Sequence, residues 1–246
     1  MLWYKSWLET RWRFLIGLAL LLCLAGATVF TYPQVMKLMP MVPTNVTGPL
    51  GERIREAAAL ARDYRGYVWS QWFRQNGRQW TTLFAIILGT AGLLTPSSGA
   101  LFTLSLPVSR RRLLGIRAAT GLSELLLLAF LPALVIPMLS PAIRENYNVG
   151  NALVHSACLF VVTSVFFSLA FLFSTFFDDL WRPLLIALAI AIALGIADQI
   201  FGIYRVMSAE TYFRTGHLPW SGLAITAAAS AAFCYAAVIN IQRRDF

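Results

Sequence analysis

Long uncharged runs dominate the hydrophobic pattern of this chain. Three of them, at 14–32, 152–177 and 218–241, contain no Asp, Glu, Lys or Arg. Each is about as long as the roughly 20 residues that an α-helix needs to cross a hydrocarbon core. Because a segment in lipid must satisfy its own backbone hydrogen bonds, each run is predicted to be a membrane-spanning helix.

Three further apolar segments bring the predicted number of spans to six. The second span starts near Gln79 and runs towards Ser98, the third covers 113–139 and contains Arg117 and Glu124, and the fifth covers 183–204. The pattern therefore predicts an all-α integral membrane protein, folded as a single transmembrane domain over residues 1–246.

Residues 1–13 have the pattern of an amphipathic helix. Apolar side chains recur on one side and charged side chains on the other: Trp3, Trp7 and Leu8 against Lys5, Glu9 and Arg13. A helix of this kind lies in the headgroup plane with its apolar face towards the lipid tails. We therefore expect an interfacial helix before the first span.

The stretch 33–78 is polar and is predicted to be an extracytoplasmic loop. Pro49 suits the first turn of an amphipathic helix within it, and Gly66 suits that helix's end. Aromatic residues then gather where the chain approaches the second span: Tyr67, Trp69, Trp72, Phe73 and Trp80. Such a cluster is typical of an aromatic belt at the membrane interface.

Composition and charge agree with a membrane protein. Hydrophobic residues make up 58% of the chain and charged residues 13%, which leaves too little polar surface for a soluble domain. The net charge of +9 would suggest nucleic acid as the partner of a soluble protein. Here the cations lie between apolar runs, so contact with the lipid bilayer explains them and no nucleic-acid partner is expected.

The distribution of cations favours an inner-membrane, multi-pass protein with both termini in the cytoplasm. With six spans in this orientation, cytoplasmic segments hold ten of the twenty Lys and Arg residues. Seven of the other ten lie in the long loop, which the positive-inside rule weights less than short loops.

The segment 99–112, between the second and third spans, is the most informative part of the chain. Leu104, Leu106 and Val108 alternate with polar residues up to Pro107, and three consecutive arginines begin at Arg110. One interpretation of a short basic loop is that it is a topology anchor and nothing more. It can also be a stiff, cationic element through which a soluble partner pushes on the membrane helices.

The sequence Leu104-Ser105-Leu106-Pro107-Val108-Ser109-Arg110, followed by Leu113-Leu114, resembles the cytoplasmic loop of permease subunits in ABC transporters of the type-two exporter class. The amphipathic start, the six spans and the closing Arg244-Asp245-Phe246 are also similar to that family, so the likeness covers nearly the whole chain. One departure is the Pro-Ser-Ser-Gly-Ala of 96–100, where many members have an acidic residue and Gly-Thr.

The resemblance implies that 99–112 is a coupling helix that contacts ATPase subunits. The implied contact residues are Leu104, Leu106, Pro107, Val108, Ser109, Arg110, Arg111 and Arg112. It further implies a dimer with a second permease copy or homologue, and a hydrophobic or amphipathic substrate moved by alternating access. The chain itself has no G-x-x-x-x-G-K-[ST] motif, so ATP and Mg²⁺ are expected on the partner subunits. No cofactor or metal, and no enzymatic activity, is expected in this chain.

Two other classes of function stay open from the residues alone. A passive channel or ion-coupled carrier would be expected to show internal repeats or helices broken around intramembrane charges. A polytopic membrane enzyme would need a convergent polar cluster within the spans. Glu124 is the candidate intramembrane polar site, and it would either line a gate or substrate path or bond a neighbouring helix.

Overall fold

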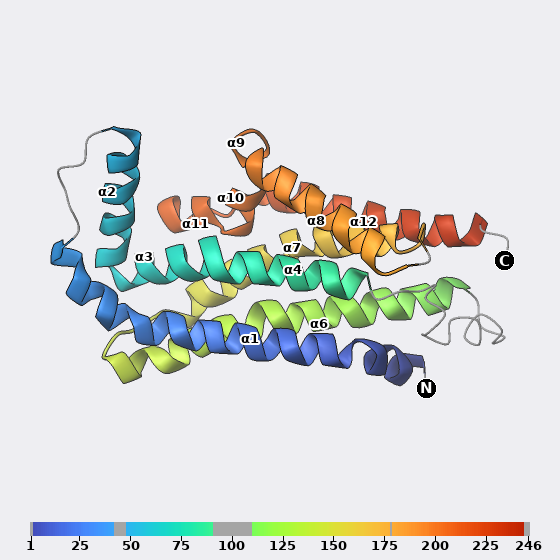
Figure 1. Cartoon of the computed structure of the whole chain (residues 1–246), viewed down its shortest axis with the longest axis horizontal. Coiled ribbons are helices and arrows are strands. Elements are labelled where there is room, and N and C mark those ends of the chain that lie inside the picture. The colour runs from blue at the N-terminus through green and yellow to red at the C-terminus, as the bar shows by residue number, and fades with distance from the viewer. Residues whose placement is uncertain (1, 42–47, 91–109, 178, 244–246) are drawn as a thin grey trace.

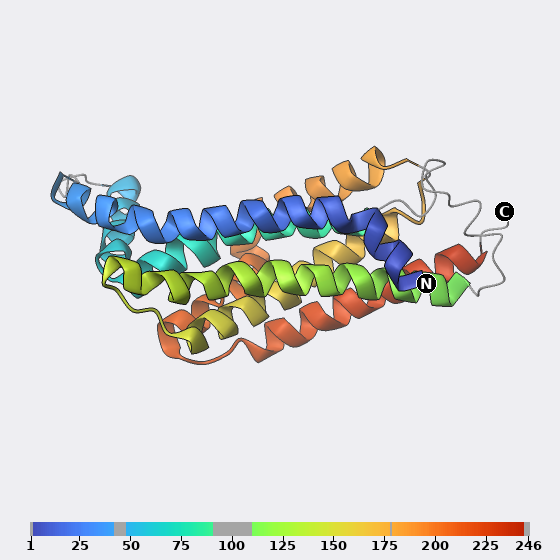
Figure 2. The same cartoon turned by 90° about the horizontal axis from the view of Figure 1, so that it is seen from below.

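The computed structural model describes residues 2–41, 48–90, 110–177 and 179–243. Within these ranges the chain is helical, with short connections and no strand. The longest helices lie side by side along one axis, and α2 stands across one end of the bundle (Figures 1 and 2).

The helices follow one another with short connections. In order, they are α1 (Leu2–Leu38), η1 (Met39–Met41), α2 (Pro49–Arg62), α3 (Tyr64–Val68), η2 (Trp69–Asn76), α4 (Gly77–Gly89), α6 (Arg110–Leu139), η4 (Ser140–Ile143), α7 (Val149–Phe173), α8 (Trp181–Ile196), α9 (Asp198–Phe201), α10 (Ile203–Met207), α11 (Glu210–Thr215) and α12 (Trp220–Arg243). Of these, η1 and η4 are 3₁₀ turns and η2 is a π-helix.

Four helices within the described ranges are long and apolar enough to cross a membrane. They span Trp3–Leu38, Arg111–Ile143, Val149–Phe173 and Trp220–Arg243. The shorter apolar helix α8 has 16 residues. This is the architecture of an all-α membrane protein, as the hydropathy pattern predicted, whereas the count of six spans stays a prediction.

The first and last helices have their outer ends at the same end of the bundle. The start of α1, the start of α6 and the end of α12 all lie at the right-hand end in Figure 1. A chain that runs the length of the bundle an even number of times begins and ends at the same end of it. The side of the membrane on which this end lies stays a prediction.

The segment predicted as the end of a loop is helical and packed into the bundle. From Tyr64 to Gly89 the elements α3, η2 and α4 follow without a break. Trp69, Trp72 and Phe73 are fully buried within this segment, so these three residues do not form an exposed interfacial belt. The Trp69 ring stacks on Phe213 of α11 with ring centroids 4.4 Å apart.

The first helix is longer than its apolar run indicated. It passes through Pro33 and continues to Leu38, beyond the predicted end at Tyr32. The predicted helix starting at Pro49 is present as α2, but it ends at Arg62, before Gly66. Asp63, with extended backbone, stops α2, and its Oδ2 accepts the Gly66 N–H to cap α3.

Close backbone approach holds the central helices together. A Cβ on Gly121 of α6 would clash with the Phe167 ring of α7, and a Cβ on Gly89 of α4 would clash with the Phe167 carbonyl oxygen. Small residues let membrane helices pack this closely. At the α12 side, Ser168 and Ser230 share a hydrogen bond of 2.7 Å.

Candidate functional site

The predicted ATPase-contact segment is only partly within the described residues. Leu104, Leu106, Pro107, Val108 and Ser109 lie outside them. Arg110, Arg111 and Arg112 form the first turn of α6, and the last two side chains are exposed. The Arg111 Nη2 donates a hydrogen bond of 3.1 Å to Gln242 Oε1 near the end of α12. The arginine turn is therefore tied to α12.

A cluster of polar side chains joins α1 to α6 just beyond this turn. The Arg117 Nη2 lies 3.1 Å from Glu9 Oε2, and both side chains are mostly shielded from solvent. The next residue of α1 also contacts α6: the Thr10 hydroxyl donates a hydrogen bond of 2.5 Å to Glu124 Oε1, about two turns after Arg117. Thr10 and Glu124 are 4% and 3% exposed, so this contact is in the interior.

Arg13 extends the same cluster to α4. Its Nη1 donates a hydrogen bond of 3.4 Å to the Ile87 carbonyl oxygen. We call Glu9, Thr10, Arg13, Arg117 and Glu124 the α1–α6 polar cluster. It connects three helices at the end of the bundle where α1 and α6 begin.

The start of α1 is oriented by this cluster. Glu9 and Arg13 face the neighbouring helices, whereas Trp3 and Trp7 are 55% and 39% exposed. The apolar side of the predicted amphipathic segment therefore points away from the protein. This segment is no separate helix, because α1 is continuous from Leu2, although its beginning bends away from the line of the rest (Figure 2).

Pairing within the cluster would lower the cost of placing its charges within a membrane. An unpaired charged group within a span costs roughly 2.5–3.5 kcal/mol on insertion scales, so such groups face protein and find partners. Glu9 and Arg117 form an ion pair, and Glu124 accepts a hydrogen bond from the Thr10 hydroxyl. Glu124 Oε2 is buried and has no hydrogen-bond partner among the described residues.

Glu124 was predicted either to bond a neighbouring helix or to line a gate, and the structure shows the helix-to-helix bond. The partner, Thr10, was not predicted. A signal existed, because Arg117 and Glu124 are seven residues apart and lie on one face of α6. Glu9 is on the polar side of the opening segment, where a pairing with that face could have been proposed, whereas Thr10 follows Trp3 by seven residues and is on the side of Trp3.

The described residues offer no obvious metal centre. Within the described ranges, no group of three or more His, Cys, Asp or Glu side chains is placed to hold a metal ion.

Comparison with known proteins assigns the chain to no family. No protein-family model, curated protein or solved structure matches the chain. The resemblance to exporter permeases therefore stays a prediction from the sequence.

Proposed function

We propose that the chain is the membrane-spanning permease subunit of an ATP-driven ABC exporter. It would move a hydrophobic or amphipathic substrate by alternating access, powered by separate ATPase subunits. The observation that carries the proposal is the α1–α6 polar cluster, which ties two long helices together directly behind the three arginines.

The position of the cluster allows it to transmit a displacement of the arginine turn to the other helices of the bundle. Arg117 follows Arg112 by five residues, which is about 7.5 Å along a helix. A displacement of the α6 start would reach α1 through the Arg117–Glu9 ion pair and through Glu124 and Thr10. It would reach α12 through Arg111.

The proposal requires partners that hold the nucleotide. Since the sequence has no phosphate-cradling loop, ATP and Mg²⁺ would bind to ATPase subunits docked on Leu104–Arg112. A second permease copy or homologue would complete the transporter. The docking end would face the cytoplasm of a cell with an inner membrane, in the orientation that the cation distribution favours.

Charge reversal tests the docking role. Replacing Arg110, Arg111 and Arg112 with Glu should abolish co-purification of the ATPase subunits and substrate-stimulated ATP hydrolysis, because a cationic docking turn becomes anionic. The measurement is the ATPase recovered with affinity-purified permease, together with its hydrolysis rate.

A matched control reverses three exposed arginines at other positions. Arg55, Arg62 and Arg144 are exposed, and reversing them changes the net charge equally. This control should keep the ATPase. If the arginine-turn variant also retained full association and stimulated hydrolysis, the docking assignment would be rejected.

A specific observation favours an ion-coupled carrier as the second candidate. The segment predicted as the fifth span, 183–204, is broken: α8 ends at Ile196, and α9 and α10 follow. Asp198 lies at the break, where its Oδ1 accepts the Tyr204 N–H at 2.8 Å. Discontinuous helices around charged groups are typical of ion-coupled carriers. Ion-driven uptake by the purified chain alone, in vesicles without ATP, would select this alternative.

A further inference from the structure

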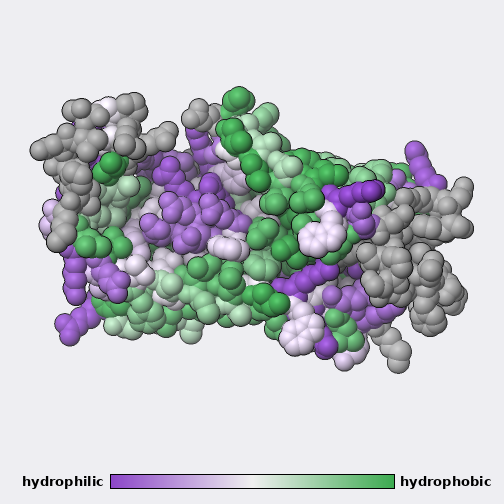
Figure 3. Space-filling view, in the orientation of Figure 1, coloured by the Kyte–Doolittle hydropathy of each residue, from purple (hydrophilic) through white to green (hydrophobic). Residues whose placement is uncertain are grey.

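A groove runs between α4 and α8 and is closed at one end by η2, α9 and α10. Its volume is about 740 Å³, within the range of small-molecule sites. Figure 3 shows hydrophilic residues gathered on this face of the molecule beside a hydrophobic surface. The residues that line the groove include none of the α1–α6 polar cluster.

Three arginines line the groove without forming ion pairs. Arg74 lies 5.7 Å above the Trp69 ring, and Arg78 lies 4.8 Å above the Tyr204 ring. The Arg78 Nε is buried and has no hydrogen-bond partner in the described part of the chain. Neither these two nor Arg205 pairs with a carboxylate of the described residues.

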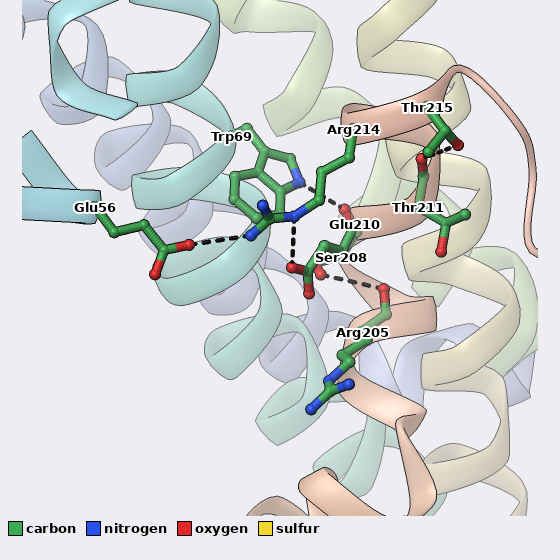
Figure 4. Close-up of polar contacts among 8 residues, drawn as sticks. All are labelled: Glu56, Trp69, Arg205, Ser208, Glu210, Thr211, Arg214 and Thr215. Atoms are coloured by element: carbon green, nitrogen blue, oxygen red, sulfur yellow. Dashed lines mark hydrogen bonds and ion pairs between the residues drawn. The ribbon is translucent and has the colours of Figure 1, made fainter. Parts of the chain in front are cut away.

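The two carboxylates in the groove already have partners. Asp198 accepts the Tyr204 backbone N–H. Glu210 Oε1 lies 2.9 Å from Arg214 Nε, and Arg214 also pairs with Glu56 of α2 at 3.0 Å (Figure 4). The hydrogen bonds that Arg214 donates to Glu56 and Glu210 raise the pKa of Arg214. Arg214 carries one positive charge for two carboxylates, so the charged residues that line the groove leave a net excess of one positive charge: three guanidinium groups against Asp198 and Glu210.

Polarity changes along the length of the groove. Arg78 is in the first turn of α4, and the apolar Leu83 lies further along that helix. The chain runs along α8 in the opposite direction, so Leu188 and Ile192 come before the polar end at Asp198. Cations therefore collect at one end of the groove, and apolar side chains form the other.

We propose that this groove binds one anionic phospholipid. Its phosphate contacts Arg74, Arg78 and Arg205, and an acyl chain lies along the apolar end at Leu83, Leu188 and Ile192. Guanidinium groups match the geometry of phosphate oxygens, and these three form no ion pair with a carboxylate of the described residues. A lipid fits better than free phosphate because free phosphate would leave the apolar end unfilled. This proposal does not depend on the transport function.

Lipid binding to the purified full chain tests the proposal. In detergent, native mass spectrometry would measure the affinity for phosphatidylglycerol and for the zwitterionic phosphatidylcholine. The variant carrying Arg74→Gln, Arg78→Gln and Arg205→Gln should lose phosphatidylglycerol binding, by about fivefold for each arginine. The control with Arg55→Gln, Arg62→Gln and Arg144→Gln removes the same charge from exposed positions and should bind as the parent does.

A steric variant separates the shape of the groove from its charge. A Cβ on Gly195 would be in ordinary contact with Tyr204, 3.5 Å from its Cε2, and Gly195 lines the groove. Gly195→Phe should therefore occupy the groove and reduce phosphatidylglycerol binding while all three arginines remain. Thermal unfolding of each variant would show that it is folded.

Three outcomes would overturn the proposal. The first is equal binding of phosphatidylglycerol and phosphatidylcholine by the parent protein. The second is an equal loss in the arginine variant and its control, which would indicate general surface attraction. The third is displacement of the lipid by millimolar inorganic phosphate, which would indicate a site for the free anion.

Discussion

The hydrogen bond between Thr10 and Glu124 should contribute measurably to stability. Thr10→Val removes the hydroxyl but keeps the branched shape of the side chain. Because Glu124 Oε2 already has no partner among the described residues, this change leaves the whole buried carboxyl group without a described hydrogen bond. An unsatisfied buried polar group costs roughly 1–3 kcal/mol, whereas hydrogen bonds between membrane helices reach about 1.7 kcal/mol. We expect Thr10→Val to lower the free energy of unfolding by about 1.5 kcal/mol.

Reversible unfolding in mixed micelles, with SDS as the denaturant and helicity as the signal, would measure this loss. A double-mutant cycle with Glu124→Leu, which cannot accept the hydrogen bond, isolates the pair, and the coupling energy should be about 1 kcal/mol. Thr28→Val is the matched control. Thr28 is also buried in α1, but among the described residues its hydroxyl donates to the Leu24 carbonyl oxygen of its own helix. That variant should be nearly neutral.

The reasoning fails if Thr10→Val costs no more than Thr28→Val and the coupling energy is near zero. Transport separates the two roles considered for Glu124. Unchanged transport by Glu124→Gln with lowered stability would leave Glu124 a structural role only. Lost transport with unchanged stability would assign it to a gate or substrate path.

The same unfolding assay tests two further contacts. Trp69→Phe removes the 2.9 Å hydrogen bond from Nε1 to the Ser208 carbonyl oxygen. It should lower the free energy of unfolding by about 1 kcal/mol more than the control Trp72→Phe, because the Trp72 Nε1 has no partner among the described residues. Equal losses of stability in the two variants would contradict this. Gly89→Ala forces α4 away from α7 and should cost about 1–3 kcal/mol, whereas Gly115→Ala, with open space around its Cβ, should be neutral or stabilising. Equal effects of the two Ala variants would show that the close α4–α7 approach is unimportant.

Hydropathy predicted the long helices because crossing a membrane requires a continuous apolar run. The run at 14–32 lies within α1, the run at 152–177 overlaps α7 and continues past its end at Phe173, and the run at 218–241 begins two residues before α12. The helix beginning at Pro49 was predicted from turn chemistry, which is also local. Features that depend on residues close together in the sequence could therefore be predicted from it.

The burial of the aromatic cluster could not be predicted from the local sequence in this way. Trp69, Trp72 and Phe73 have the composition of an interfacial belt, and the interface and a protein core both favour such residues. What decides between them is a surface to pack against. Here Phe213 of α11 stacks on Trp69, and His155 of α7 stacks on Phe73 with ring centroids 4.7 Å apart.

The sequence by itself determined that the chain is helical, apolar and suited to a membrane, because each property follows from residues close together in the chain. Only the tertiary structure decided which polar groups meet. Thr10 and Glu124 are 114 residues apart, and Trp69 and Ser208 are 139 apart. Such pairs form because apolar packing brings whole helices together, and a buried polar group then bonds whichever partner lies within reach.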